Sequence, residues 1–373
     1  MATRRRPGVP TTTSTATRTA AAAPAGRTRG TPPPIDLALQ GGGSHGAFTW
    51  GVLDRLLEDE ELCFDGVSGT SAGALNAAVM ACGLAAGGRA GARAALDAFW
   101  NDIASHGRCF GQGTPWAVDL SAAWPLAWPA EANPFHAWTS QWLRWLSPYQ
   151  WNPLGLDPLR DVVQRHVRPA DLRRAPVAVF VTATSVRSGQ PRVFSASDLS
   201  VDALLASACL PQLFRAVHID GEPYWDGGYS GNPALWPLIY RTSALDLVLV
   251  RINPLERTRL PSTADEIADR VNEITFNAGL IGELRAIAFV HKLVSEGRVD
   301  PGRYKDLRLH MVADDEGLAP LPPSSKLNTE RSFLLRLRAL GRDAAERWLQ
   351  AHRGDLGRRS SLDVRATFLE RQR

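Results

Sequence analysis

The chain has 373 residues, enough for one large domain or two ordinary ones, and its hydrophobic fraction of 44% is sufficient for a sizeable core. The formal net charge of +4 is small for this length, which argues against nucleic-acid binding as the main role of the folded part. Four widely spaced cysteines indicate neither a disulfide framework nor a zinc site, so a reducing compartment fits best.

The first 34 residues are rich in arginine, threonine, alanine and proline, and they carry six arginines without an acidic residue. They lack the apolar core of a secretory signal, and their prolines argue against an amphipathic transit peptide. We therefore expect a disordered basic tail over 1–34. No run of 18 apolar residues follows, so we expect no transmembrane helix and a cytoplasmic location, with peripheral membrane contact left open.

Ordered structure is expected to begin at Ile35 with two consecutive strand–turn–helix units. The first has an apolar strand over 35–40, a glycine-rich turn and a helix over 47–58. The second has a strand over 62–67, a glycine-flanked turn and a small-residue helix over 72–84. Such units predict a mainly parallel sheet with helices on its faces, which is a three-layer α/β/α fold.

The second turn reads Gly69-Thr70-Ser71-Ala72-Gly73, a match to Gly-x-Ser-x-Gly. At a sharp strand-to-helix turn, side chains at the glycine positions would clash, and the serine Oγ is presented above the sheet. The positive end of the following helix lies beneath it. Ser71 is therefore a candidate nucleophile, while a turn without chemistry is the alternative for the pentapeptide alone.

The first turn reads Gly41-Gly42-Gly43-Ser44-His45-Gly46 and could serve three purposes. A dinucleotide-binding loop fits the glycine spacing, but no acidic strand end follows at the expected distance. A P-loop is excluded because no Gly-Lys-Ser/Thr follows. An oxyanion hole makes chemical sense beside a serine turn, since successive glycines let backbone N–H groups approach a substrate closely.

The remainder of the chain alternates helices with apolar strands. Helices are predicted over 87–105, 157–167, 201–209, 264–296 and 329–352, and strands over 177–184, 245–252 and 307–312. Between them, the segment 219–229 contains Tyr224-Trp225-Asp226-Gly227-Gly228. There, Asp226 either marks an ordinary turn or is held as a carboxylate at the edge of the sheet.

Seven of the twelve tryptophans lie between Trp116 and Trp151, and Trp138, Trp142 and Trp145 recur at helical spacing. A packed aromatic element is the simpler interpretation. The functional interpretation is an apolar cap or acyl-chain groove that touches a lipid surface, where tryptophan is favoured. We therefore treat about 107–155 as a Trp-rich insertion.

A serine hydroxyl needs a base to take its proton. The usual Ser-His-Asp arrangement is disfavoured here, because His166, His291 and His352 lie on predicted helices with charged neighbours and no histidine occupies a small-residue loop after a late strand. The remaining candidate is a carboxylate that acts directly on Ser71. Asp226 is the one acid framed by glycines after a strand.

In their order along the chain, the glycine loop, the serine turn and the Asp-Gly-Gly motif resemble the patatin-like phospholipase family. The small-residue run 206–211 and Asn232-Pro233 are similar to that family as well, and the resemblance covers roughly 35–255. It implies a Ser-Asp dyad that hydrolyses lipid acyl esters, with Ser71 as nucleophile and Asp226 as proton acceptor. It also implies an oxyanion hole in the loop Gly41, Gly42 and Gly43, with the last two as N–H donors, and neither metal nor cofactor. The glycines that support these motifs are Gly46, Gly69, Gly73, Gly227 and Gly228.

One position departs from the family's pattern, because His45 stands where the family usually carries arginine or lysine. A histidine is only partly protonated near neutral pH, so we expect any anion-stabilising role of His45 to depend on pH. Two alternatives stay open. One is a Ser-His-Asp esterase or thioesterase that uses His45 or His218, and the other is a non-catalytic protein that binds a lipid or polymer surface.

The predicted organisation is a basic tail over 1–34, a patatin-like catalytic domain over 35–255 and a mostly helical region over 256–373. The predicted strand near 307–312 suggests that this last region packs on the same domain. The expected partners are a lipid or other acyl-ester substrate and, through the Trp-rich insertion, a membrane or lipid surface. No nucleic-acid partner is expected.

Overall fold

The computed structural model describes residues 33–106, 147–152, 155–257, 259–300 and 303–370. Its strands are β1 (Pro34–Leu39), β2 (Cys63–Thr70), β3 (Ala178–Ser185), β4 (Pro191–Ser195), β5 (Val217–Ile219), β6 (Glu222–Asp226), β7 (Asp246–Val250) and β8 (Arg308–Val312). Its main α-helices are α1 (Gly46–Leu56), α2 (Ala72–His106), α6 (Pro158–His166), α7 (Pro169–Arg174), α8 (Val201–Ser207), α9 (Trp236–Arg241), α10 (Ala264–Ser295) and α12 (Arg331–His352). Shorter helical elements are α5 (Pro148–Trp151), α11 (Asp315–Leu318), η1 (Gly43–His45), η5 (Gly227–Tyr229) and η6 (Pro323–Leu327).

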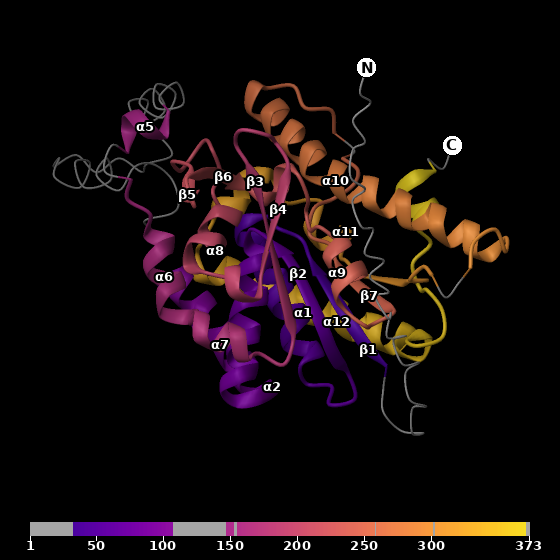
Figure 1. Cartoon of the computed structure of the whole chain (residues 1–373). Helices are drawn as coiled ribbons and strands as arrows, with labels where there is room; N and C mark the ends of the chain where they lie inside the picture. Colours follow the sequence, from indigo (N-terminus) through magenta and orange to yellow (C-terminus); the bar gives the residue numbers. More distant parts are fainter. Residues whose placement is uncertain (1–32, 107–146, 153–154, 258, 301–302, 371–373) are drawn as a thin grey trace, which may run out of the picture. The chain divides into compact units, whose positions relative to one another are not determined.

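The described strands form one eight-stranded sheet with the order β5-β6-β3-β2-β1-β7-β8, and β4 pairs with β3 (Figure 1). The strands β3, β2, β1, β7 and β8 pair in parallel. The strands β4, β5 and β6 add antiparallel pairs at one side. The mainly parallel α/β fold predicted from the sequence is therefore confirmed.

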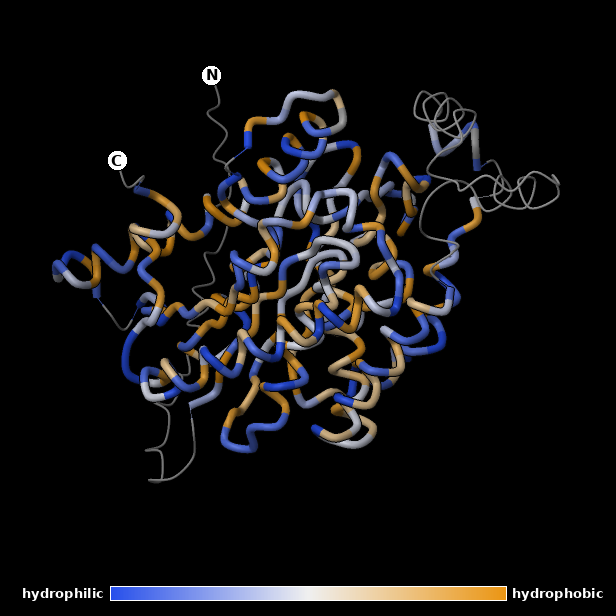
Figure 2. Tube along the Cα trace, turned by 180° about the vertical axis from the view of Figure 1, so that it is seen from behind, coloured by the Kyte–Doolittle hydropathy of each residue, from blue (hydrophilic) through white to orange (hydrophobic). Residues whose placement is uncertain are grey.

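Side chains alternate between the two faces of the sheet, so two separate hydrophobic clusters form. Leu37 and Leu39 of β1 join the cluster that contains residues of α1, α2 and α12. Ala38, between them, joins the cluster that contains residues of α9 and α10. Figure 2 shows that hydrophilic and hydrophobic residues alternate along the helices. This pattern is expected for helices that pack one face against the sheet and expose the other to solvent. Helices thus cover both faces of the sheet, which makes three layers.

The predicted helices and strands recur with ends shifted by a few residues, and α2 has non-helical backbone at Gly87 and Gly88, where the sequence predicts a break between two helices. The strands β4 and β5 and the helices α7 and α9 were not predicted from the sequence. The tail over 1–32 and most of the Trp-rich insertion, with Trp138, Trp142 and Trp145, lie outside the described residues. None of the helices in the described ranges has the length and apolar composition that crossing a membrane requires.

The helices α1 and α12 touch backbone to backbone. A Cβ added at Gly341 of α12 would lie 2.0 Å from the carbonyl oxygen of Phe48, and one at Gly51 of α1 would lie 2.0 Å from the carbonyl oxygen of Arg338. Both contacts are far below van der Waals distance, and the atom that is met is backbone and cannot swing aside. The packing of the C-terminal helix on α1 therefore depends on these two glycines.

We expect Gly341→Ala to destabilise the protein by roughly 1–3 kcal/mol or more, because α12 must move away from α1. Gly282→Ala is the matched control, since a Cβ at this exposed glycine of α10 meets no atom within 4 Å. A better helix former there should stabilise by about 0.5–1 kcal/mol. Denaturant unfolding measures both, and a Gly341→Ala variant as stable as the wild type would contradict the described packing.

Candidate active site

The strands β2 and β6 run in opposite directions along β3, and both end beside the same two residues of β3, Thr182 and Ala183. β2 pairs with β3 up to Thr70, opposite Thr182, and β6 pairs with the next residue, Ala183, through Asp226. Because β4 occupies the other edge of β3 along both stretches, β2 and β6 share one edge. Ser71, the residue after β2, and Asp226, the last residue of β6, are thereby brought together.

Ser71 adopts a strained backbone conformation at the junction of β2 and α2, with a φ of 55°. A Cβ at Gly69 would lie 2.5 Å from the carbonyl carbon of Gly73, and one at Gly73 would lie 2.2 Å from the carbonyl oxygen of Leu39. The Ser71 N–H donates to Ser207 Oγ at 2.9 Å. The turn therefore needs both flanking glycines and presents Ser71 as the sequence predicts for a nucleophile turn.

Asp226 is completely buried. Burial raises the pKa of its carboxyl to about 7, against smaller lowering effects of the Gly228 N–H and the Ser71 side chain. Oδ1 accepts the Gly228 N–H at 2.7 Å. Oδ2 is buried and accepts no hydrogen bond of ordinary geometry from the described residues, while the Ser71 side chain is near enough to lower the pKa of the carboxyl.

The two glycines after Asp226 are required by close contacts. A Cβ at Gly227 would lie 2.1 Å from the carbonyl oxygen of Thr182, and one at Gly228 would lie 2.6 Å from the Phe276 ring of α10. The Phe276 ring also packs edge-on against Tyr229, with 5.0 Å between the ring centroids. The Asp-Gly-Gly segment is thus fixed between the sheet and α10, which fixes the direction of the carboxyl.

The glycine loop lies directly against Ser71. A Cβ at Gly41 would lie 2.7 Å from Ser71 Cβ, so no other residue fits there without displacing the serine turn. The Gly41 N–H donates to Asn232 Oδ1 at 2.6 Å and is not available to a substrate. The Gly42 and Gly43 N–H groups donate to no acceptor among the described residues. Of the three glycines expected in the oxyanion hole, Gly42 and Gly43 are therefore the donors to consider.

Side-chain amides that the sequence analysis did not single out hold this loop in place. Asn253 Nδ2 donates to the Gly41 carbonyl at 2.8 Å, and Gln40 Oε1 accepts the backbone N–H groups of Ile252 and Asn253, each at 3.0 Å. Gln40 and Asn253 follow β1 and β7 closely. A sequence signal for Gln40 and Asn253 exists, because both are amide side chains shortly after a buried parallel strand. The carboxyl ends of such strands meet at one edge of the sheet, where binding sites commonly form.

His45 does not behave as the sequence led us to expect. Its ring is buried, and burial lowers its pKa to about 3, with further lowering by Lys326 and Arg257. His45 is therefore neutral at physiological pH, and the expected pH-sensitive anion-stabilising role is wrong. Its Nε2 lies 2.7 Å from Ser325 Oγ. Because that hydroxyl donates to the Pro322 carbonyl at 2.6 Å, His45 is the donor in this contact.

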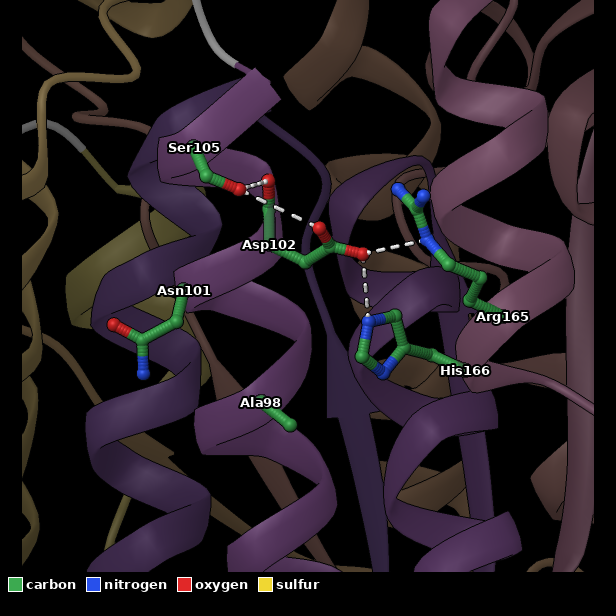
Figure 3. Close-up of a pocket in the computed structure, with 6 residues that line it drawn as sticks. All are labelled: Ala98, Asn101, Asp102, Ser105, Arg165 and His166. Atoms are coloured by element: carbon green, nitrogen blue, oxygen red, sulfur yellow. Dashed lines mark hydrogen bonds and ion pairs between the residues drawn. The ribbon is translucent and has the colours of Figure 1, made fainter.

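The histidines considered for a catalytic triad lie elsewhere. Neither His45 nor His218 has a hydrogen bond to Ser71 among the described contacts, and His218 is exposed on β5. Asp102, Ser105 and His166 line a shallow pocket of about 450 Å³. Figure 3 shows that Asp102 contacts both Ser105 and His166. There the Asp102 carboxylate binds Arg165 and His166. His106 Nδ1 lies 3.2 Å from Ser105 Oγ, but that hydroxyl donates to the Asp102 carbonyl at 2.9 Å, within its own helix. We interpret this pocket as a surface ion-pair cluster.

A second Ser-His-Asp series is present near the start of β7. His310 Nδ1 lies 2.9 Å from Ser361 Oγ, and its Nε2 lies 3.1 Å from Asp246 Oδ1. However, the Ser361 N–H is occupied by the Leu309 carbonyl, and Arg308 binds both oxygens of Asp246. Without a free N–H donor at the serine this series lacks an oxyanion hole, and we interpret it as a structural link between the sheet and the C-terminal segment.

A family model described as patatin-like phospholipase matches residues 37–239, more than half of the chain, and the chain therefore belongs to this family. The solved structure of VipD from Legionella pneumophila is similar over 86% of this chain and 67% of VipD, with 14% identity and a TM-score of 0.38. ExoU from Pseudomonas aeruginosa, in its heterodimeric complex with SpcU, matches 86% of this chain with 20% identity and a TM-score of 0.34. This chain spans 52% of the length of that ExoU chain. No curated protein sequence matched.

We expect Asp226→Asn to stabilise the protein in a pH-dependent manner. The pKa of the carboxyl is raised from an ordinary 3.8 in the unfolded chain to about 7 in the folded protein. Ionisation of Asp226 therefore lowers the free energy of unfolding between about pH 4 and pH 7, and the full loss is reached above pH 7. The gain over the wild type should be largest above pH 7, shrink as the pH falls through 7 and vanish below about pH 4. Each unit of pKa shift corresponds to about 1.4 kcal/mol.

Asp65→Asn is the control of opposite sign. Although burial opposes ionisation, hydrogen bonds from Ser243 and Ala244 outweigh it and lower the pKa of Asp65, so this variant should lose stability at neutral pH. Thermal unfolding from pH 4 to pH 8.5 measures both. A difference between Asp226→Asn and the wild type that does not change with pH would contradict the buried, raised carboxyl.

Proposed function

We propose that the protein is a serine acyl hydrolase that cleaves lipid acyl esters with a Ser71–Asp226 dyad. The observation that carries the proposal is the meeting of β2 and β6 on one edge of β3, which puts a strained serine beside a completely buried carboxyl. Membership of the patatin-like phospholipase family supports lipid hydrolysis as the general activity.

In the first half of the proposed reaction, Ser71 Oγ bonds to the acyl carbon while its proton passes to Asp226. The carbonyl oxygen becomes an oxyanion that the Gly42 and Gly43 N–H groups stabilise. When the C–O bond to the alcohol breaks, Asp226 returns the proton to the leaving oxygen. The products of this half are the free alcohol and an ester of Ser71.

In the second half, water attacks the acyl-Ser71 ester and gives a proton to Asp226. The tetrahedral species then releases the carboxylic acid, and Ser71 Oγ recovers the proton. A pKa of about 7 suits Asp226 to this exchange, because a base near the ambient pH can both accept and return a proton. A carboxyl at an ordinary pKa would be a much weaker base.

We also propose that the C-terminal region, 256–373, belongs to the same domain as the site. Two observations support this proposal. β8 extends the sheet by pairing with β7, and α12 packs against α1 through the glycines described above. In this view the catalytic unit is larger than the residues 37–239 that the family model matches.

We expect Ser71→Ala and Asp226→Asn each to lower hydrolysis of a p-nitrophenyl acyl ester and of phospholipid vesicles by about a thousandfold or more, since nucleophile and base act as one unit. Ser68→Ala is the control for the serine, because Ser68 is buried on the same strand and only donates to the Ala234 carbonyl. Asp36→Asn is the control for the acid. Asp36 is equally buried, and burial likewise raises its pKa to about 7, but it lies near the start of β1.

Both controls should keep activity. If Ser71→Ala and Asp226→Asn keep it as well, the dyad is wrong. If a histidine variant such as His45→Ala or His218→Ala abolishes activity while Asp226→Asn does not, the Ser-His-Asp esterase is the better account.

A further inference from the structure

The segment η6 packs directly on the glycine loop. A Cβ at Gly43 would lie 2.3 Å from the carbonyl oxygen of Lys326, and the backbone of Gly43 has a φ of +58°, so only glycine fits there. Ser325 Oγ, 280 positions along the chain from His45, accepts that ring's Nε2–H. The shape of the loop around Gly43 thus depends on residues beyond the segment 37–239.

The side chain of Lys326 turns its ammonium toward the same loop. Only 19% of this side chain is exposed, and burial lowers the pKa of its amine. Lys326 Nζ donates to Asn253 Oδ1 at 2.9 Å and lies 4.0 Å from Glu273 Oε1. An ammonium this far from water is costly unless its contacts compensate for the lost hydration.

Through Asn253 the ammonium acts on the backbone of the glycine loop. An amide side chain can present either its oxygen or its nitrogen in a given direction. Because Lys326 is a pure donor, it requires the oxygen of Asn253 to face it, and the nitrogen then points to the Gly41 carbonyl at 2.8 Å. Asn253 Nδ2 also donates to Gln40 Oε1 at 3.2 Å, so Lys326 and Gln40 together orient the hydrogen bond to Gly41.

The charges around this chain of contacts leave a positive excess. Glu273 binds Arg257 at 2.6 Å and Arg270 at 3.2 Å, in addition to facing Lys326. Asp269 is the other acid that acts on Lys326. Three cations thus face two carboxylates around Glu273. In the glycine loop itself, Lys326 and Arg257 lower the pKa of His45 more than Glu273 raises it, so the net effect of these charges on the loop is positive. A positive field there favours negative charge at the Gly42 and Gly43 N–H groups.

We propose that Lys326 is a positioning residue of the oxyanion hole: it orients Asn253 on the Gly41 carbonyl and places a buried positive charge behind Gly42 and Gly43. The inference rests on the proposed acyl-hydrolase function and adds to it a residue of the C-terminal region. It predicts that Lys326 affects the transition state more than substrate binding, because Lys326 acts through the loop.

The test uses the full chain with Lys326→Met, which keeps the length of the side chain and removes its donors and charge. We expect kcat on a p-nitrophenyl acyl ester to fall about tenfold to a hundredfold with KM changed less than about threefold, somewhat less than the loss of a direct oxyanion donor. The rate at which a fluorophosphonate labels Ser71 should fall by the same factor. Asn253→Ala should reproduce the loss, and Lys326→Met should add little to it in the double variant.

Lys305→Met is the matched control. Lys305 is similarly buried, at 13% exposure, and its Nζ donates to the Leu238 and Thr242 carbonyls beside Asp36, near the start of β1. Its replacement should lower the melting temperature and leave the rate of Ser71 labelling unchanged. If Lys305→Met slows labelling as much as Lys326→Met does, the effect is general destabilisation and the inference is wrong.

The remaining outcomes separate the inference from the proposed function. If the wild type is labelled at Ser71 and Lys326→Met, shown to be folded by circular dichroism, is labelled equally fast, the positioning role fails and the dyad stands. If Lys326→Met does not fold, the Asn253→Ala variant provides the test instead. A rate of Ser71 labelling in Asn253→Ala equal to that of the wild type would overturn the inference. If the wild type is not labelled at Ser71 at all, the proposed function fails and the inference with it.

Discussion

The burial of one carboxyl beside one hydroxyl is the constraint on which the rest of the described structure depends. Asp226 has no exposed surface, and burial raises its pKa to about 7. A buried carboxyl of this kind lowers the stability of the folded protein at neutral pH. The surrounding backbone must therefore be packed closely enough to keep the carboxyl in this position. The glycines on either side of Ser71 and after Asp226 meet that requirement, because each lies so close to neighbouring backbone or ring atoms that a side chain would not fit.

The region that surrounds this pair is broader than the segment that defines the family. The glycine loop is held at Gly41 by hydrogen bonds to Asn232 and Asn253, and η6 packs against Gly43. The helix that follows η6 is itself held against α1 by backbone contacts at Gly51 and Gly341. A continuous series of close contacts therefore connects the C-terminal region to the loop proposed as the oxyanion hole.

Much of this could be predicted from the sequence, because the informative features are local. A strand, a glycine turn and a helix in succession predicted the parallel sheet, and the turn at Ser71 and the acid at Asp226 were identified in the same way. The assignment of both as catalytic stays a prediction. The strands β4 and β5 were missed because they are short, lie at the side of the sheet and follow no clear alternation. The neutral state of His45 and the contact of Lys326 with Asn253 depend on packing between segments distant in sequence, which no local pattern encodes.

The pH dependence of Ser71 labelling by a fluorophosphonate tests the central claim most directly, because it reports the base without a leaving alcohol or a deacylation step. If Asp226 takes the Ser71 proton, the labelling rate of the wild type should rise with pH through a single apparent pKa near 7 and level off above it. In Asp226→Asn the residual rate should be low and should lose that titration. A titration near pH 7 that survives in Asp226→Asn would assign the base to another group and contradict the account.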